Sequence, residues 1–211
     1  AKSDSKAKNT TVGYDVSTIK KDDELAKLAA SAKTVKDGEL SVGMELSYAP
    51  AEFYAEDGKT PVGYDVDMSK AIAQTLGLKP KIVSSMFDTI VPSIGSKYDL
   101  GIAAFTKTPE RAEEIDFSDL YEKSAQLLIV KAGNADLYST KESLAGQKVG
   151  AQKGTIQSQL IQTALPDSEL FELEKYPALA LEVQNGNIAG LVVDQAVGES
   201  LIATSNGGLE V

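Results

Sequence analysis

The sequence predicts an open α/β fold built from two units, each containing a mostly parallel sheet. Short apolar stretches of strand length alternate with helical patterns over residues 40–130, and the same alternation returns over residues 147–193. Such alternation is typical of parallel strands that are connected by helices. The 211 residues suffice for one domain or two small lobes, and the repeated pattern favours two lobes.

The first lobe is expected to span residues 19–130. It follows residues 1–18, which are rich in Lys, Ser, Asp and Asn and are expected to form a flexible tail. Leu25 and Leu28 recur at helical spacing and predict a short amphipathic helix over residues 20–33. The later elements are predicted as strands over 40–44, 81–83, 98–103 and 126–130, and helices over 66–76 (closed by Gly77), over 88–94, and from Thr108.

The second lobe is expected to span residues 131–211. Its predicted elements are strands over 147–151, 169–173 and 188–193, and helices over 155–165 and 178–184. Ala132-Gly133-Asn134 is the best candidate for the crossing between the lobes, and hinge motion is expected near Ala132. Because no low-complexity linker precedes the second unit, we expect the two lobes to share a cleft.

The composition excludes several classes of chemistry. The chain has no Cys and no His, so it can form no Cys/His zinc site, no Cys nucleophile and no Ser-His-Asp triad. We expect no metal and no cofactor. A net charge of −10 argues against nucleic acid as a partner.

Two observations concern the location of the protein. No apolar run approaches the roughly 18 residues needed to span a bilayer. Residues 1–10 lack a signal-peptide pattern and an initiator Met, so the sequence is expected to be a mature form whose leader has been removed.

The single arginine, Arg111, is a candidate anion-binding residue in a chain that otherwise uses lysine. Its guanidinium presents parallel N–H donors that match a carboxylate two at a time. Thr108 as N-cap and Pro109 as first helical residue place Arg111 in the first turn, where the helix dipole disfavours a cation. A nearby anion would explain this placement, and a surface pair with Glu113 or Glu114 explains it equally well from this segment alone.

Ligands of open α/β sheets bind at the carboxyl ends of strands, and other candidate residues occupy such positions in the first lobe. Glu45 and Tyr48 follow the first strand and could hold a cationic or polar group, although a solvated loop is the simpler reading. Phe87 follows the second strand, where a core residue is favoured over a cleft wall. Thr106 follows the third strand and could converge with Arg111 on one anion.

The second lobe offers an acid and a helix N-terminus. Thr155 opens a predicted helix, and Asp194 ends a predicted strand. Both can also be helix caps, which is the favoured reading for Thr155 and an even alternative for Asp194. Together with Arg111, they suit a zwitterion, whose carboxylate would bind Arg111 and whose ammonium would bind Asp194.

Several motifs resemble the amino-acid-specific solute-binding proteins of bacterial ABC importers (family 3), and the resemblance runs from about Gly38 to Asp194. The motifs are Gly-Tyr-Asp-Val-Asp at 63–67, Lys-Tyr-Asp-Leu at 97–100, Thr-Pro-Glu-Arg-Ala at 108–112 followed by Ile-Asp-Phe-Ser at 115–118, Leu-Ala-Gly-Gln-Lys-Val-Gly at 144–150, and Lys-Gly-Thr at 153–155.

The resemblance implies a two-lobed, type II periplasmic-binding-protein-like fold. In that family the lobes close over one free amino acid, which a membrane permease and its ATPase then receive. It also implies an extracytoplasmic location, either lipid-anchored at the cell surface or periplasmic or secreted. Family members continue past the position of Val211 with a strand and helices that return to the first lobe. Because the sequence stops at Val211, we expect this C-terminal return to be missing, either through truncation or with a partner chain that supplies it.

The resemblance also assigns roles to the candidate residues. Arg111 would bind the ligand α-carboxylate, helped by Thr106 and the backbone near Ala104. Asp194 would bind the α-ammonium, and Thr155 would reach the carboxylate from the other lobe. The ligand side chain would contact Glu45, Tyr48 and Phe87.

The expected ligand is a basic amino acid, arginine or lysine, because Glu45 is an acid and Tyr48 offers an aromatic face to a cation. Glutamine remains an alternative, since an acid also accepts from an amide. Many relatives carry a hydroxyl residue or glycine in place of Ile156, so no contact is assigned there. Relatives often have Phe in place of Ala51, which predicts a wider pocket.

Two other classes of function are open. An enzyme on the same scaffold, such as a carboxylate-using dehydratase or lyase, would use Glu45 as its acid or base. It ranks well behind a binding protein, because the chain has no His and two groups already suited to a zwitterion. A solute sensor module that contacts a receptor instead of a permease is the third reading.

Overall fold

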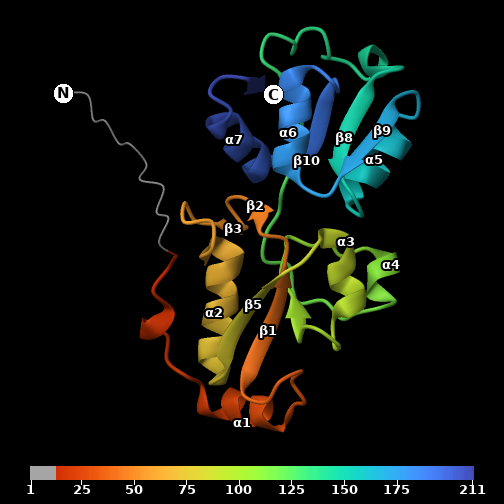
Figure 1. The fold of residues 1–211 in the computed structure, drawn as a ribbon. Coiled ribbons are helices and arrows are strands. Elements are labelled where there is room, and N and C mark those ends of the chain that lie inside the picture. The colour runs from red at the N-terminus through yellow and green to blue at the C-terminus, as the bar shows by residue number, and fades with distance from the viewer. Residues whose placement is uncertain (1–12) are drawn as a thin grey trace, which may run out of the picture.

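The computed structural model describes residues 13–211, and the chain forms two lobes, one above the other in Figure 1. The expected tail therefore lies outside the described residues as far as residue 12. From Gly13 onward the chain runs along the first lobe, where the Tyr14 N–H donates to Asp67 at 2.9 Å. In residues 13–211, no helix is both long and apolar enough to cross a membrane.

The first lobe is built on a parallel three-stranded sheet in the order β5-β1-β6. The apolar side chains Val42 and Met44 of β1 are fully buried, because this strand lies between its two neighbours and under a helix. That helix ends at Gly77 in the left-handed conformation (φ 67°), as predicted. The elements are η1 (Val16–Thr18), α1 (Asp23–Ser31), β1 (Glu39–Met44), α2 (Tyr64–Leu76), β5 (Lys79–Ser84), α3 (Phe87–Ile90), η2 (Val91–Ser93), β6 (Leu100–Gly101) and α4 (Pro109–Ala112).

A small antiparallel sheet lies between the lobes and was not predicted. It consists of β2 (Ser47–Tyr48), β3 (Glu52–Tyr54) and β4 (Pro61–Val62), and Figure 1 shows β2 and β3 directly below the second lobe. Tyr48 and Ala51 belong to a hydrophobic cluster whose other buried members come from the second lobe. This sheet therefore brings a first-lobe loop into the packing of the second lobe.

The second lobe contains a five-stranded mixed sheet in the order β11-β7-β10-β8-β9. The pairs β8–β9 and β8–β10 are parallel, as predicted, whereas β7 pairs antiparallel with both β10 and β11. Ile129 and Leu191 are fully buried at its centre. The elements are β7 (Gln126–Lys131), η3 (Glu142–Leu144), β8 (Lys148–Gln152), α5 (Ile156–Ala164), β9 (Glu169–Leu173), α6 (Tyr176–Asn185), β10 (Gly190–Asp194), α7 (Gln195–Thr204) and β11 (Leu209–Glu210).

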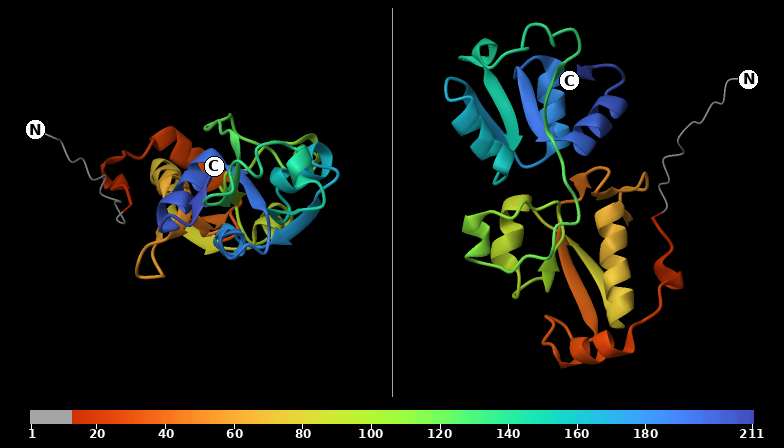
Figure 2. Two further views of the ribbon diagram at one scale, coloured as in Figure 1. Left: turned by 90° about the horizontal axis from the view of Figure 1, so that it is seen from above. Right: turned by 180° about the vertical axis from the view of Figure 1, so that it is seen from behind.

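The chain passes from the first lobe to the second at Lys123. The Tyr64 hydroxyl donates to Glu122 at 2.6 Å within the first lobe. One residue beyond Lys123, the Ser124 hydroxyl oxygen accepts from the Gln195 N–H at 3.2 Å in the second lobe. The segment before β7 is visible between the lobes in the right-hand view of Figure 2.

The expected crossing at Ala132 is therefore wrong. Ala132 lies inside the second lobe, where its N–H donates to the Gly208 carbonyl at 3.0 Å. The boundary between the lobes lies before β7 and not after it, because the backbone hydrogen bonds of β7 go to β10 and β11. An apolar strand pattern indicates burial, but it does not indicate which of two sheets the strand joins.

Candidate functional site

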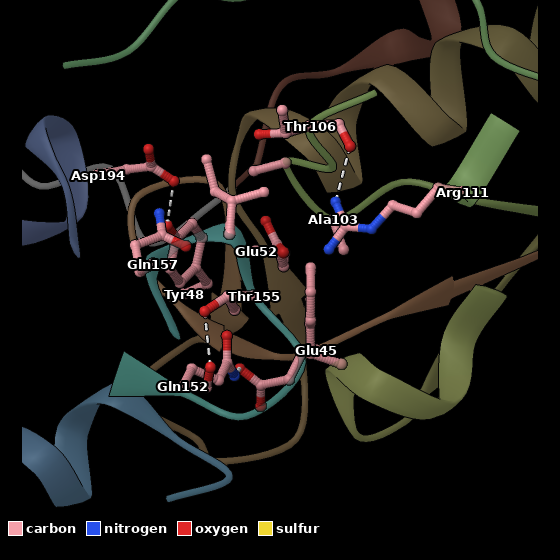
Figure 3. Close-up of a pocket in the computed structure, with 13 residues that line it drawn as sticks. Glu45, Tyr48, Glu52, Ala103, Thr106, Arg111, Gln152, Thr155, Gln157 and Asp194 are labelled. Atoms are coloured by element: carbon pink, nitrogen blue, oxygen red, sulfur yellow. Dashed lines mark hydrogen bonds between the residues drawn. The ribbon is translucent and has the colours of Figure 1, made fainter. Parts of the chain in front are cut away.

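A pocket lies between the two lobes, and all eight residues predicted from the sequence line it (Figure 3). The first lobe contributes residues from β2, from β3 and from the segments that follow β1, β5 and β6. The second lobe contributes the end of β8, the start of α5 and the end of β10. The lining residues are Glu45, Tyr48, Glu52, Phe87, Ala103, Ala104, Thr106, Arg111, Gln152, Thr155, Ile156, Gln157 and Asp194.

Arg111 lines the pocket and lies between two backbone carbonyls. Its Nη1 donates to the Thr106 carbonyl at 2.7 Å, and its Nη2 donates to the Gly154 carbonyl of the second lobe at 3.1 Å. The guanidinium carbon lies 5.4 Å from the ring centroid of Phe87 and 5.3 Å from that of Phe105. Partial burial lowers the pKa of Arg111, but guanidinium remains charged in proteins.

The local helix is formed as predicted. The Thr108 hydroxyl oxygen accepts from the Arg111 N–H at 3.2 Å, and Pro109 occupies the first helical position. No ion pair within residues 13–211 joins Arg111 to Glu113 or Glu114. The surface-pair reading of this arginine therefore has no support in the structure.

Asp194 turns toward the pocket and does not cap the helix that follows it. Although it stands at the N-cap position of α7, its side chain accepts no hydrogen bond from that helix. Its Oδ1 accepts from the Gln126 amide at 2.5 Å, and its Oδ2 accepts from the Tyr48 hydroxyl of the first lobe. Gln126 in turn accepts from the Gln157 amide at 2.8 Å. All donors to Asp194 are neutral, so its negative charge has no cationic partner among these contacts.

Glu45 is buried, so the reading of this segment as a solvated loop is wrong. Its residue is only 3 % exposed. The Ser47 hydroxyl lies 2.8 and 2.7 Å from its two carboxylate oxygens, and the Gln152 amide donates to Oε2 from the second lobe at 3.3 Å. Burial raises the pKa of Glu45, and the hydrogen bond from Ser47 opposes this effect.

For Thr155 and Phe87, both interpretations of the sequence hold. Thr155 is a helix cap that also lines the pocket, and Phe87 is a core residue that also forms part of the pocket wall. The Thr155 hydroxyl oxygen accepts from the Ser158 N–H at 3.3 Å, which makes it the N-cap of α5, while the residue also lines the pocket. Phe87 belongs to a buried cluster with Ile90 and stacks on Phe105 at 4.6 Å between centroids, and it too lines the pocket.

Ala104 lines the pocket, but its N–H is already used. It donates to Asp65 Oδ2 at 3.1 Å. Ala104 also adopts a positive φ of 48°, a conformation that is unfavourable for a residue with a Cβ. The contact with Asp65 therefore stabilises an unusual turn directly before Thr106.

Sequence reasoning did not assign Glu52, Gln152, Gln157 and Ala103 as lining residues, and Ile156, to which no contact was assigned, also lines the pocket. Gln152 stands directly after the predicted strand over residues 147–151, so the rule of strand ends could have found it. Glu52 carried no such signal, because the small sheet that places it was not predicted.

A further contact joins the lobes beside the pocket. Lys153 of the second lobe forms an ion pair with Asp88 of the first at 2.9 Å. Gly154 follows with a positive φ of 77°, and a Cβ added there would lie 2.8 Å from the Asp88 Cβ. The lobes are thus in close contact along this edge.

The family model that describes bacterial extracellular solute-binding proteins, family 3, matches residues 40–187. The chain belongs to this family. The predicted resemblance and the two-lobed fold are therefore confirmed, and close relatives are binding proteins.

The individual proteins that this chain resembles are named as amino-acid-binding or substrate-binding proteins. The ABC transporter arginine-binding protein 1 of Escherichia coli is 28 % identical over 79 % of this chain and 67 % of its own length, so the chain spans about two thirds of this curated relative. A solved substrate-binding protein, AbpA of Streptococcus pneumoniae bound to L-arginine, has a TM-score of 0.78 and 34 % identity, covering 82 % of this chain and 74 % of that one. An ancestral amino acid-binding protein described as a precursor of cyclohexadienyl dehydratase has a TM-score of 0.74 and 33 % identity, covering 79 % and 75 %.

Proposed function

We propose that this protein captures a free L-amino acid between its lobes and delivers it to the permease of an ABC importer. The observation that carries the proposal is that Arg111 and Asp194, which belong to different lobes, line one pocket. We also propose an extracytoplasmic location, lipid-anchored or periplasmic or secreted, since delivery requires access to the outer side of the permease.

The positive charge of Arg111 is available to the ligand carboxylate. Both of its hydrogen-bond acceptors are neutral carbonyls, those of Thr106 and Gly154, and the rings of Phe87 and Phe105 exclude water from one side. A carboxylate placed against the remaining guanidinium N–H groups would form charge-assisted hydrogen bonds, which are stronger than neutral ones. Thr106 and Thr155 also line the pocket and are proposed to assist.

The negative charge of Asp194 is available to the ligand ammonium. The Tyr48 and Gln126 side chains hold its two oxygens in place without neutralising them. An α-ammonium would supply the missing opposite charge. Because Arg111 and Asp194 carry opposite charges, the pair selects a zwitterion over a simple anion or a simple cation.

The charge balance of the pocket favours a basic ligand. When Glu45 and Asp194 are both ionised, Arg111 offsets one of their two negative charges. A ligand of net charge +1, such as arginine or lysine, would offset the other and leave the least uncompensated charge in the pocket. Tyr48 and Phe87 supply aromatic surface beside Glu45. Relatives named as arginine-binding support the same choice, and glutamine remains the alternative polar ligand.

An enzyme on this scaffold is the second candidate. Burial raises the pKa of Glu45, which is a property of general acids, and one similar structure is a precursor of a dehydratase. Incubation of the protein with its tightest ligand, followed by mass spectrometry, separates the two functions. A new product would replace the binding proposal with the enzymatic one.

A thermal-shift panel of the twenty amino acids tests the proposed function. A ligand that binds only the folded protein raises the melting temperature by mass action, and we expect the largest increase with arginine or lysine. The desamino analogue of the best ligand should give a much smaller increase, and Arg111→Met should abolish the response to both. An increase that is equal for the amino acid and its desamino analogue, or that is unchanged in Arg111→Met, would contradict the proposal.

A further inference from the structure

Two carboxyl groups are buried against each other beneath the pocket. Glu52 lies on β3, lines the pocket and is only 1 % exposed. Asp65 lies in the first turn of α2 and is fully buried. Both belong to the first lobe, and the Asp65 N–H donates at 2.9 Å to the carbonyl of Ala51, the residue directly before Glu52, which brings the two carboxyl groups together.

Each carboxyl group has one buried oxygen that lacks a hydrogen-bond partner. Asp65 Oδ2 accepts from the Ala104 N–H at 3.1 Å and from the Tyr121 hydroxyl at 3.2 Å. Asp65 Oδ1 and Glu52 Oε2 are buried and have no hydrogen-bond donor. An ionised carboxylate only accepts hydrogen bonds, whereas a carboxylic acid also donates one. One proton held between the two groups would therefore satisfy both oxygens.

No cation stabilises two negative charges at this position. Within residues 13–211, neither Glu52 nor Asp65 takes part in an ion pair. Burial raises the pKa of Glu52 well above its ordinary range, and the neighbouring Asp65 raises it further; burial also raises the pKa of Asp65. The titratable groups that face the pair are all acidic or phenolic, namely Glu45, Tyr48, Tyr64, Tyr121 and Glu122.

We propose that Glu52 and Asp65 share one proton at neutral pH, and that the protonated pair positions the turn leading to Arg111. Asp65 holds the N–H of Ala104 in its left-handed conformation, and two residues later the Thr106 carbonyl accepts from Arg111. Glu52 is thus a proton donor to Asp65 and not an anionic contact for the ligand. The positioning part of this inference rests on the proposed function of Arg111.

Loss of the proton would place two negative charges in contact. Their repulsion would be strong because both groups are buried, and the turn at Ala104 would lose its fixed acceptor. A group whose pKa is raised on folding stabilises the protein fully below its unfolded pKa, and this contribution is lost as the pH rises toward the folded pKa. The pair should therefore stabilise the ligand-free protein less at pH 8 than at pH 5.

The first test uses the ligand-free protein, so it does not depend on the proposed function. Glu52→Gln keeps a hydrogen-bond donor and cannot ionise. As the pH rises from about 5 to 8, the melting temperature of the wild type should fall relative to that of this variant. Glu56→Gln, on the exposed turn of the same hairpin, is the matched control and should follow the wild type. If the melting temperatures of wild type and Glu52→Gln changed in parallel with pH, the proposal of a shared proton would be wrong.

Infrared spectroscopy at neutral pH gives a direct second measurement, because protonated carboxylic acids and carboxylates absorb at different frequencies. The wild type should show an acid band that Glu52→Gln or Asp65→Asn lacks. Two variants are used so that a folding failure of one leaves the measurement intact. Identical spectra for wild type and a folded variant would overturn the proposal.

The second test measures positioning through affinity for L-arginine. Glu52→Gln should bind within about threefold of wild type. Glu52→Leu leaves Asp65 without its donor and should bind roughly tenfold or more weakly, as expected for a buried group that loses its partner. Loss of affinity in Glu52→Gln would instead make Glu52 an anionic ligand contact and overturn the positioning role. If the wild type binds no amino acid, the proposed function is wrong. The pH and infrared measurements then still test whether Glu52 and Asp65 share a proton.

Discussion

At the scale of single residues, Arg111 is distinguished by what it does not contact. Its partners are the Thr106 and Gly154 carbonyls and two aromatic rings. Neutral acceptors fix the direction of the guanidinium without neutralising it. The fork geometry therefore matters as much as the charge, and lysine cannot reproduce it.

We predict that Arg111→Lys weakens amino-acid binding by about 2–5 kcal/mol, the range for disrupting a buried, hydrogen-bonded charge pair. Lysine keeps the charge but loses the parallel donors. Isothermal titration calorimetry measures the change, and Lys107→Met, on the exposed loop nearby, serves as a control that should bind normally. Undiminished affinity in Arg111→Lys would contradict the assignment of the carboxylate to Arg111.

Asp194→Asn should weaken binding of amino acids by a similar amount, because the amide cannot offset an ammonium. Asparagine retains an acceptor for the Tyr48 hydroxyl and the Gln126 amide, so the local structure should be preserved. The desamino analogue of the best ligand is the control, and its weaker binding should be unchanged or improved. Equal losses for the two ligands would assign Asp194 a structural role only.

Single residues were predictable where a simple rule applied. Arg111, Asp194, Thr155 and Glu45 all stand at strand ends or helix starts, which can be read from hydrophobic patterns. The contacts that these residues make were not predictable: Gln126 and Gln152 stand at strand ends, but no local pattern shows that they pair with Asp194 and Glu45. Their contacts depend on tertiary packing, which no local pattern encodes.

At the scale of elements, Gly154 connects β8 to α5 at the point where the lobes touch. Its positive φ favours glycine, and the Asp88 Cβ leaves no room for a side chain. Gly133 also has a positive φ, 89°, but nothing lies within 4 Å of an added Cβ. The two glycines share a backbone conformation and differ in their surroundings.

We predict that Gly154→Ala and Gly133→Ala each destabilise the protein by about 1–2 kcal/mol, the cost of a Cβ in the left-handed region. Only Gly154→Ala should also weaken ligand binding, because its methyl group would hold the lobes apart. Chemical denaturation and calorimetry measure the two effects. If the two variants bound the ligand equally well, the contact at Asp88 would have no part in closure.

Element prediction succeeded for most strongly patterned segments and failed for the shortest strands and for α7. The strand Glu169–Leu173 has the expected bounds, and α2 ends before Gly77 as expected but begins two residues earlier than predicted, at Tyr64. The strands β2, β3 and β4 contain two or three residues each, too few to show a period. Neither α7 nor β11 was predicted, and the predicted helix over residues 88–94 is divided, with a 3-10 turn at Val91–Ser93 that contains a proline.

At the scale of the whole molecule, the lobes meet through polar contacts around the pocket. The partners are Tyr48 with Asp194, Gln152 with Glu45, Arg111 with Gly154, and Lys153 with Asp88. The two-lobed arrangement itself was predicted from family motifs and is confirmed. The crossing between the lobes at Lys123 was not predicted, because the polar residues around it show no pattern that distinguishes a crossing from an ordinary loop.

Lys153→Met should weaken ligand binding by at most about fivefold, because half-exposed ion pairs contribute little. The loss should shrink further at high salt, which screens such pairs. Lys148→Met removes a comparable pair with Glu169 that lies wholly within the second lobe, and it should leave affinity unchanged at both salt concentrations. A loss in Lys148→Met equal to that in Lys153→Met would exclude a specific role for the pair between lobes.

The small sheet between the lobes also determines how binding should respond to temperature. Tyr48 and Ala51 of the first lobe are buried in the hydrophobic cluster of the second, with the Tyr48 ring centroid 5.5 Å from that of Tyr176. Separating the lobes would expose these apolar groups to water, so closure over even a fully charged ligand should carry a negative heat-capacity change. Since apolar burial stabilises less on cooling, this contribution to affinity should fade in the cold, whereas the ionic contacts of the pocket remain.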